Sequence, residues 1–321
     1  MPNPYIFKTR ALGPNAKNST LTFDELDNSL LFLSSSITTL EFTPFSGSNY
    51  SFIEANGTPL QNGSSLIASY NIAKTTTPTG SNRYSVLLGP GNYEFTQSFN
   101  INTPYIDVVS FTGYKDVYIT GSNTIQVSAN NVYVRGIDVG SKNFTITSSE
   151  SNTIFKNCKG GDYSFGGSIN NQNSFTISST FIDCEGGDYS FAGNGYAYGI
   201  FTDCIGKNSS FGNTCNGTFT NCTGGSSSFA NQGNIDSSTF LNCQGKDFSF
   251  AYAAIITNNS ILKECIGGLN SFANLSPNGR DISTLLDKCT LTSGSWSTNN
   301  LANNSRLIDC IQPTNTLITT P

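Results

Sequence analysis

Apolar residues recur at fixed distances from a series of cysteines in the second half of the chain. The series consists of Cys158, Cys184, Cys204, Cys222, Cys243, Cys265, Cys289 and Cys310, and it leaves out only Cys215. Three positions before these cysteines stand Phe155, Phe181, Phe201, Phe219, Phe240, Leu262, Leu286 and Leu307. Seven positions after them stand Phe165, Phe191, Phe211, Phe229, Phe250, Phe272, Trp296 and Leu317. This agreement predicts an internal repeat with two apolar ladders and a cysteine ladder.

Polar residues and glycine also hold fixed places in each copy. Serine stands immediately before the second apolar residue in the first seven copies, from Ser164 to Ser295. Glycine stands two positions after six of the cysteines, from Gly160 to Gly267. Successive copies are 18 to 26 residues apart, which is the length of one turn of a solenoid.

The composition of the copies predicts strands and tight turns. They are rich in Gly, Ser, Thr, Asn and Phe rather than in good helix formers. The predicted fold is therefore all-β, a parallel β-helix in which the same position of successive turns stacks at a strand spacing of about 4.8 Å. The unequal lengths of the turns favour the right-handed form over the left-handed form, which usually has a strict six-residue repeat.

The residue before each cysteine is predicted to form a corner. Residues three positions apart cannot both point inward from one straight strand, yet the ladders require Phe155 and Cys158 to share the interior. Asn and Asp tolerate the left-handed backbone conformation that bends a chain. We therefore expect Asn157 and its equivalents to turn the chain between the two inward residues.

The stacked cysteines are expected to be buried free thiols that act as small apolar fillers. Disulfides between some of them are the alternative, because stacked cysteines in adjacent turns are close enough to bridge. A zinc site would need CxxC pairs or histidines, and the chain has neither. No bound metal is therefore expected.

The overall composition narrows the classes of function. Charged residues make up only 12% of the 321 residues and the net charge is −5 without a basic cluster, so no nucleic acid is expected as a partner. Because there is no histidine, the commonest general base and the Ser-His and Cys-His nucleophile pairs are absent. No apolar run approaches the length of a membrane span, so no membrane insertion is expected. Nor do we expect a secretory signal or a cofactor.

A helix is predicted near the start of the chain, where Thr22 and Glu25 form a capping box. Apolar residues then follow the alternating spacing of a coiled-coil seam, which would bring several chains together. The residues assigned to this oligomerisation and attachment seam are Phe23, Leu26, Leu30 and Leu33. A single amphipathic helix is the alternative, because the serines and threonines that follow are poor helix formers.

A second helix and several strands are predicted between this region and the repeat. The helix covers Ser64 to Lys74, and its apolar face consists of Leu66, Ile67, Tyr70 and Ala73. Strands are expected at the alternating pairs Ile106/Val108, Val117/Ile119, Ile125/Val127, Val132/Val134, Ile137/Val139 and Phe144/Ile146. The chain is thus divided into an attachment segment (1–45), a linker with a helix (46–83) and a β-helix (84–321).

Two stretches resemble known families. The run L-G-P-N-A-K-N-S-T-L-T-F-D-E-L-D-N-S-L-L-F-L, from Leu12 to Leu33, resembles the N-terminal segment of tail-fibre-like structural proteins of marine tailed phages. It departs from their pattern at Asn18, usually glycine, and at Ser29, often a second asparagine. The second helix, followed by a strand that ends in P-G-N-Y, is similar to the opening of the pectin-lyase-like right-handed β-helices of tailspikes and polysaccharide lyases. That resemblance implies that the helix caps the open end of the bore.

The resemblance to tail-fibre-like proteins implies a virion protein, a tail fibre or spike component that attaches the phage to its host. Because no catalytic residue stands out in the repeat, the protein is expected to be non-enzymatic. The implied partners are other tail or baseplate proteins through the N-terminus, a host surface glycan or protein, and further copies of the chain in a homotrimer. The implied location is the exposed tail of the virion, after synthesis in the host cytoplasm. A polysaccharide-degrading tailspike and a non-viral surface adhesin or filament subunit are the alternatives.

The residues proposed for glycan binding lie in the loops after the second apolar ladder. Sugar sites combine aromatic faces with amide hydrogen bonds, and the residues of this kind are Asn194, Tyr196, Tyr198 and Tyr252. Packing of the tyrosines on a loop or against another subunit is the alternative. No catalytic residue is assigned. Stacking would place Asp162 beside Asp188 and Asp183 beside Asp203, near the spacing of retaining glycosidase carboxyls, but other copies carry non-acidic residues there, so turn formation explains them.

Overall fold

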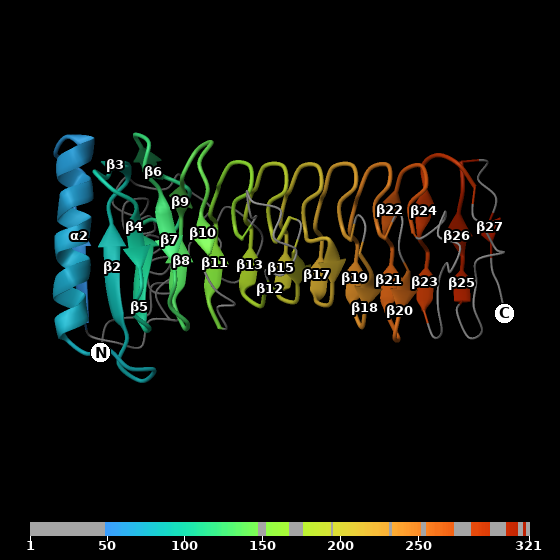
Figure 1. Ribbon diagram of the computed structural model, residues 1–321, viewed down its shortest axis with the longest axis horizontal. Coiled ribbons are helices and arrows are strands. Elements are labelled where there is room, and N and C mark those ends of the chain that lie inside the picture. Colours follow the sequence, from blue (N-terminus) through green and yellow to red (C-terminus); the bar gives the residue numbers. More distant parts are fainter. Residues whose placement is uncertain are drawn as a thin grey trace, which may run out of the picture. The chain divides into compact units, whose positions relative to one another are not determined.

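The computed structural model describes residues 49–146, 152–166, 176–193, 195–230, 233–251, 255–272, 284–295, 306–313 and 317–318. The chain divides into two compact units, Met1–Ser46 and Gly47–Pro321, and all described residues belong to the second. In this second unit the chain forms a parallel β-solenoid with one helix at its N-terminal end (Figure 1). The seam residues Phe23, Leu26, Leu30 and Leu33, and Trp296 of the second ladder, lie outside the described residues.

One long sheet runs along the whole solenoid. It contains 12 strands in the order β1 (Asn49–Ile53), β2 (Tyr84–Leu88), β5 (Ile106–Ser110), β8 (Tyr133–Arg135), β11 (Ile154–Lys156), β13 (Thr180–Ile182), β15 (Ile200–Thr202), β17 (Thr218–Thr220), β19 (Thr239–Leu241), β21 (Ile261–Lys263), β23 (Leu285–Asp287) and β25 (Arg306–Ile308). The first of these strands precedes Tyr84, the residue at which the sequence places the start of the β-helix.

Shorter sheets form the other sides of each turn. One contains β4 (Phe99–Ile101), β7 (Ile125–Val127) and β10 (Thr145–Ile146), and another contains β12 (Thr176–Ile177), β14 (Tyr196–Ala197), β16 (Thr214–Cys215), β18 (Ile235–Asp236) and β20 (Ile256–Thr257). The remaining side begins with β3 (Gly91–Glu94), β6 (Val117–Thr120) and β9 (Ile137–Asp138) and ends with β22 (Ile266–Gly267), β24 (Thr290–Leu291), β26 (Cys310–Ile311) and β27 (Leu317–Ile318). Isolated parallel bridges from Asp138 to Ile266 join its two parts.

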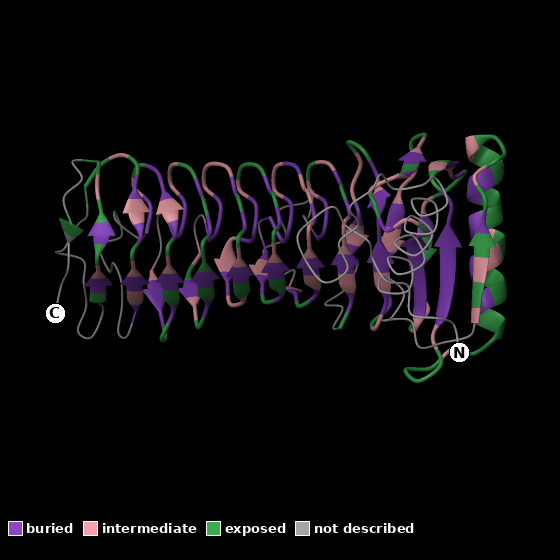
Figure 2. Ribbon diagram, turned by 180° about the vertical axis from the view of Figure 1, so that it is seen from behind, coloured by how far each residue is buried: buried purple, intermediate pink, exposed green. Residues whose placement is uncertain are grey.

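The register of the long sheet places the same repeat position of successive turns side by side. Phe181 pairs with Phe155 on one side and with Phe201 on the other, and Phe219 pairs with Phe240. The predicted β-helix and its first apolar ladder are therefore confirmed, and Figure 2 shows buried residues in every turn. The alternating pairs predicted between Ile106 and Ile146 are also buried. The right-handed sense of the coil stays a prediction.

The phenylalanines form two parallel stacks that meet edge to face in the interior. Within the first stack, the ring centroids of Phe201 and Phe219 lie 4.7 Å apart with an interplanar angle of 2°. Within the second, those of Phe211 and Phe229 lie 4.7 Å apart at 6°. Between the stacks, Phe201 meets Phe211 at 5.9 Å and 88°. Both offset stacking and edge-to-face contact are favourable geometries for aromatic rings, so the two stacks stabilise each other along the bore.

The corner predicted before each cysteine is confirmed. Asn157 and Asp183 have φ values of 51° and 52°, in the left-handed region, and the equivalent residues through Asp309 share this conformation. Asn and Asp suit the conformation, but Glu264 (φ 55°) and Lys288 (φ 53°) adopt it as well. Glutamate and lysine are strained in the left-handed region. In those two turns the backbone conformation is therefore imposed by the packing of the solenoid and not by the preference of the residue.

Replacing Lys288 with asparagine should therefore stabilise the protein. We expect the free energy of unfolding to rise by about 1 kcal/mol, because asparagine enters the left-handed region at a lower cost than lysine does. Guanidinium titration followed by circular dichroism measures the change. Lys246→Asn is the control, since Lys246 is also exposed but is not among the residues with a positive φ. Equal effects of the two substitutions would show that removal of a positive charge, rather than relief of backbone strain, is responsible.

The glycine and the serine of each repeat pack against each other. A Cβ atom on Gly186 would lie 2.3 Å from Ser190 Oγ and 3.0 Å from the ring of Phe191. The serine hydroxyl is buried and bonded to the backbone; Ser190 Oγ donates to Gly187 O at 2.8 Å. The spacing from glycine to serine in the sequence therefore reflects a contact in which only glycine leaves room for the buried serine.

The cysteines are free thiols in the interior, as expected, and no disulfide is present among the nine. Cys222 Sγ donates to Phe201 O in the preceding turn and to Thr220 O in its own turn, both at 3.4 Å. Burial raises the pKa of Cys158 and Cys184 well above the usual value of a thiol. Cys215, outside the series, fills an inward position beside Ile235 in the sheet that contains β16.

These thiols should not react with Ellman's reagent at pH 8 while the protein is folded. The reagent attacks the thiolate, which burial disfavours, and it has no access to the interior. We expect almost no absorbance change for the native protein and nine thiols per chain after unfolding in guanidinium. Rapid reaction of one or more thiols without unfolding would contradict the closed interior.

Helix α2 (Pro59–Thr75) packs against the N-terminal end of the solenoid (Figure 1). Leu66, Tyr70 and Ala73 of its predicted apolar face are buried in the common core, and Ile67 is partly buried against it. The predicted start at Ser64 was wrong. The helix begins five residues earlier, at Pro59, because Thr58 and Gln61 form a capping box there. Asn62 and Gly63 follow this capping box and lie within the helix.

The second ladder does not extend to Leu317, which was predicted to be its last member. This side chain is 59% exposed and lies on β27, which pairs antiparallel with β26. After Cys310 the chain thus reverses its direction instead of completing another parallel turn. The antiparallel strand covers the outer edge of β26, and it removes an unpaired edge from that side of the solenoid.

Candidate binding groove

The segment after each cysteine forms one outer side of the solenoid. The residue that follows the cysteine joins the ladder of bridges, as Lys159, Glu185 and Ile205 do in three successive turns. Two residues then follow that are glycines in the first two of these turns. Because glycine has no side chain, this side is hollowed between the bridge residues and the residue after the glycines.

The residue after the glycines forms a hydrogen-bond ladder along the solenoid axis. Asp162 Oδ1 accepts from Asp188 N at 2.8 Å, and Asp188 Oδ1 accepts from Asn208 N at 2.9 Å. Asn208 Oδ1 accepts from Ser226 N at 3.0 Å in the next turn. An amide oxygen does the same work as a carboxylate oxygen, so the acidic pair Asp162 and Asp188 has a structural role in common with a residue that has no charge.

At several steps the ladder packs closely against a glycine of the next turn. A Cβ atom on Gly187 would lie 2.1 Å from Asp162 Oδ1 and 2.5 Å from Asp162 N. On Gly268 it would lie 2.1 Å from Asp247 Oδ1, which accepts from Leu269 N at 2.7 Å. At Gly187 and Gly268 the carboxylate of one turn therefore occupies the space that a side chain of the next turn would need, whereas the turn of Lys207 makes the same ladder bond with a lysine at this position.

A groove of about 350 Å³ follows from this arrangement. We call it the glycine groove; its glycines are Gly140, Gly160, Gly161, Gly186 and Gly187, and its polar and apolar side chains are Ser141, Lys159, Asp162, Glu185, Ile205 and Lys207. It spans four successive turns, those of Gly140, Lys159, Glu185 and Ile205. In the last of these turns Lys207 takes the place of the second glycine, so its side chain stands at that end of the groove.

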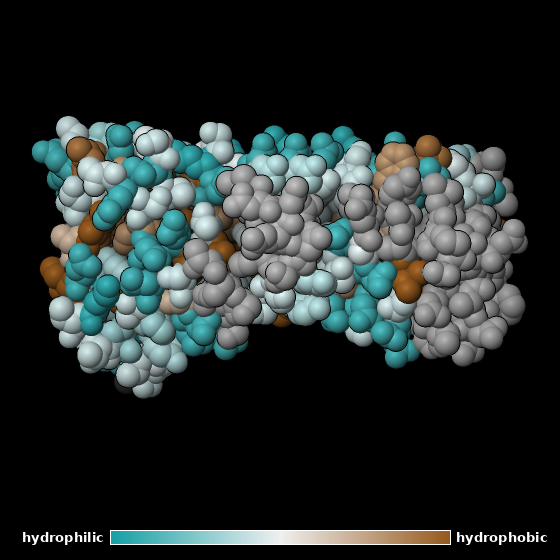
Figure 3. Space-filling view, in the orientation of Figure 1, coloured by the Kyte–Doolittle hydropathy of each residue, from teal (hydrophilic) through white to brown (hydrophobic). Residues whose placement is uncertain are grey.

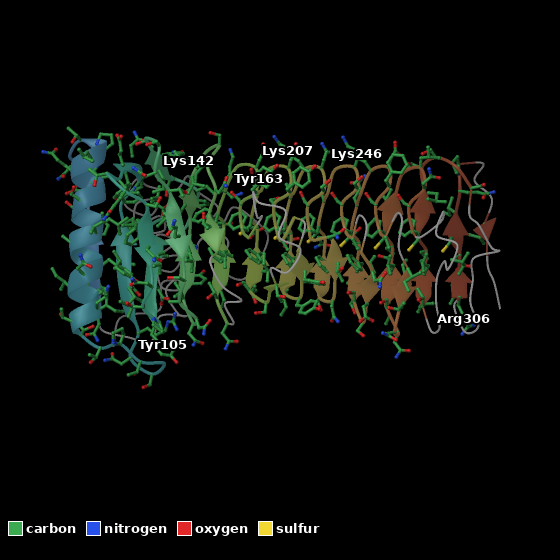
Figure 4. The ribbon with its side chains drawn as sticks, viewed as in Figure 1. Tyr105, Lys142, Tyr163, Lys207, Lys246 and Arg306 are labelled. Atoms are coloured by element: carbon green, nitrogen blue, oxygen red, sulfur yellow. The ribbon has the colours of Figure 1, made fainter. Side chains whose placement is uncertain are left out.

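The charges of the glycine groove are mixed and differ in their pairing. Glu185 forms an ion pair with Lys115, and Lys159 Nζ lies 3.7 Å from Asp138 Oδ2. Lys207 is exposed and forms no ion pair with any residue that the structure describes. Figure 4 shows Lys207 on the same edge of the solenoid as Lys142, Tyr163 and Lys246, and Figure 3 shows that the middle of this edge is mainly hydrophilic. The groove therefore offers both hydrogen-bond donors and acceptors to a ligand.

The tyrosines predicted for glycan binding lie elsewhere. Tyr196 is on β14 and Tyr198 follows it; their ring centroids are 5.9 Å apart at 54°, and Tyr198 is 45% exposed. Neither lines the glycine groove. Asn194 and Tyr252 lie outside the described residues. The structure thus shows an accessible tyrosine pair, and whether it binds a glycan stays a prediction.

The second acidic pair, Asp183 and Asp203, lies at the corners before the cysteines. Asp203 Oδ1 accepts from Asn221 Nδ2 at 2.9 Å, and Asn221 Oδ1 accepts from Asn242 Nδ2 at 3.0 Å. This is a ladder of side-chain amides in which one member is a carboxylate. The left-handed backbone of both aspartates and the side-chain partner of Asp203 give the pair a structural role in the corner.

The sequence prediction did not include Lys159, Glu185 or Lys207. These three residues border the groove because two successive turns have a pair of glycines, which leaves the space beside them open. In the next turn a lysine replaces one of the two glycines. That signal is visible in the sequence as G-G, G-G and G-K after three successive cysteines. It indicates a hollow, although it does not show which side chains border it.

Comparisons of the chain with protein-family models, with curated proteins and with solved structures gave no match. In the described part of the chain, no helix combines the length and the apolar character that a membrane span requires.

Proposed function

We propose that this chain is a non-enzymatic structural protein of a phage virion, a component of a tail fibre or spike that mediates attachment to the host surface. The resemblance of Leu12 to Leu33 to tail-fibre-like proteins supports the virion assignment. The observation that supports a structural role is the hydrogen-bond ladder in which Asp162, Asp188 and Asn208 perform one task. The carboxylates of Asp162 and Asp188, which stack as a catalytic pair would, already join successive turns.

In this proposal the solenoid is a rigid support that holds its outer side toward a host glycan or protein. The N-terminal segment joins other tail or baseplate proteins and brings three chains together. Several copies then act at once, so weak contacts add by avidity. The protein is exposed on the virion tail after synthesis in the host cytoplasm.

Antibodies against the purified full-length protein test the assignment. On virions examined by immunogold electron microscopy, we expect label at the tail, and we expect the same antibodies to block adsorption to host cells. Virions without label would overturn the proposal. Label without inhibition would retain a structural role but remove the role in attachment.

The solution mass of the full-length protein tests the assembly. Light scattering should give a trimer, and the double substitution Leu26→Glu with Leu30→Glu should give a monomer if the predicted seam holds the chains together. A monomeric wild-type protein would overturn the homotrimer and leave a single solenoid that docks onto a separate virion protein.

A polysaccharide-degrading tailspike is the second candidate, because Asp162 and Glu185 line the same groove. Glycosidases use two carboxyl groups on either side of the bond that they cleave. Release of reducing ends from host polysaccharide, abolished by Glu185→Gln, would support this function. A wild-type protein that adsorbs to the polysaccharide without shortening it would exclude it.

A further inference from the structure

We infer that the glycine groove binds a short, neutral stretch of an oligosaccharide. This inference rests on the proposed attachment function and names the part of the surface that recognises the host. It differs from the expectation for the tyrosines, because none of the groove's lining residues is aromatic.

The first argument is the size and shape of the groove. Its volume of about 350 Å³ is at the lower end of the range for small-molecule sites. The groove crosses four turns, and with a spacing of about 4.8 Å between turns the first and fourth lie about 14 Å apart. This length suits a short oligosaccharide lying along the solenoid axis better than a single sugar.

The second argument is the chemistry of the groove's side chains. Lys159 and Lys207 donate hydrogen bonds, whereas Asp162 and Glu185 accept them. A sugar hydroxyl both donates and accepts, so a row of hydroxyls can satisfy this alternation. A phosphate or sulfate group would meet two carboxylates, and a cation would meet two ammonium groups. The mixed set therefore favours a neutral polyhydroxyl ligand over either kind of ion.

The third argument is that the floor of the groove is preformed. The amides of the floor are bonded between turns; Gly160 N donates to Glu185 O at 2.9 Å and Gly186 N donates to Ile205 O at 2.8 Å. Gly187 N donates in the same way to Gly161 O at 3.0 Å. A ligand does not have to order this backbone, which lowers the cost of binding.

The fourth argument concerns affinity. A site without an aromatic platform lacks the stacking contact that strengthens many sugar sites. Binding by one groove should therefore be weak, and attachment would depend on several copies acting together. The inference thus agrees with a fibre that carries more than one solenoid.

An array of immobilised neutral and uronic-acid oligosaccharides, probed with the labelled full-length protein, tests the inference. The first variant is Lys207→Gly, which introduces the residue that Gly161 and Gly187 supply at the same position. The second is Asp162→Asn, in which the amide oxygen can take over the bond to Asp188 N, as Asn208 does in its own turn. Both changes are compatible with the fold for these reasons.

Lys246→Gly is the matched control. Lys246 is an exposed lysine at the same position of the repeat, but it does not line the groove. We expect the wild type and Lys246→Gly to bind the same neutral oligosaccharides. Lys207→Gly and Asp162→Asn should bind them about tenfold more weakly, the effect of losing a hydrogen bond to a charged group. Melting curves followed by circular dichroism check that all three variants are folded.

Four outcomes would overturn the inference. Unchanged binding by Lys207→Gly and Asp162→Asn would exclude the groove, and loss of binding in Tyr198→Ala alone would place the site at the tyrosines. A preference for the uronic-acid oligosaccharides would exclude the neutral class. Absence of any binding by the wild type would show that the groove does not bind these oligosaccharides. Tail labelling and blocked adsorption by the antibodies would still support the proposed function.

Discussion

Replacing Phe201 with alanine is expected to lower the free energy of unfolding by about 3 to 5 kcal/mol, the range for removal of a buried aromatic side chain. The ring is fully buried and stacks on Phe181 at 5.1 Å and on Phe219 at 4.7 Å. Its edge contacts to Phe191 and Phe211 come from the second stack. The neighbours are fixed by backbone pairing on both sides and cannot move into the cavity, so the loss should lie high in this range.

The matched control is Ile200→Ala on the same strand. Ile200 is the preceding residue, but its side chain points outward and is 50% exposed. We expect this change to cost less than about 1 kcal/mol, because an exposed side chain leaves no cavity. Guanidinium unfolding followed by circular dichroism measures both variants. Similar losses for the two would mean that the strand itself, rather than the ring stack, limits stability.

Replacing Gly63 with alanine is expected to detach helix α2 from the solenoid or to cost about 3 kcal/mol, the upper end of the usual range for overpacking. A Cβ atom at this position would lie 1.9 Å from Glu94 O and 2.8 Å from Glu94 C. These are backbone atoms of β3 and cannot rotate away. The glycine, which lowers helix propensity, is thus retained because it allows the helix to approach the first turn closely.

Gly80→Ala is the control for the second substitution. The nearest atom to a Cβ at Gly80 would be a ring carbon of Tyr105 at 3.5 Å, which is ordinary van der Waals contact. We expect a change within about 0.5 kcal/mol for this variant. Thermal unfolding and proteolysis near residue 63 compare the two. A Gly63→Ala protein that melts like the wild type would show that the helix does not pack closely on β3.

The sequence was sufficient to predict the turns because each turn repeats a few absolute requirements. Phe155 and Cys158 must both face inward, Asn157 must bend between them, and each requirement is seen eight times. Because the same pattern occurs in eight copies, an exception in one copy does not change the predicted structure of the turn. The helix start was missed because its capping box at Thr58 occurs once and lies among glycines that disfavour a helix.

Other features could not be predicted, because they depend on tertiary packing. The phenylalanines of the second stack adopt the left-handed conformation, with φ of 57° at Phe165 and 60° at Phe211, which a bulky side chain rarely does. Only the burial of the ring against its neighbours compensates this strain. The partners of Glu185 are equally invisible in the sequence, since Lys115 is 70 residues away.

The interchangeable turns have a consequence for how such a protein can change over generations. Loss of residues 200–217 would place Thr218 beside Thr180 and Phe219 beside Phe181, in the pairing that Ile200 and Phe201 now have. The solenoid would shorten by one strand spacing, about 4.8 Å, without a new core. Recombination between similar copies can thus change the length of the solenoid in regular increments, while its two ends stay the same.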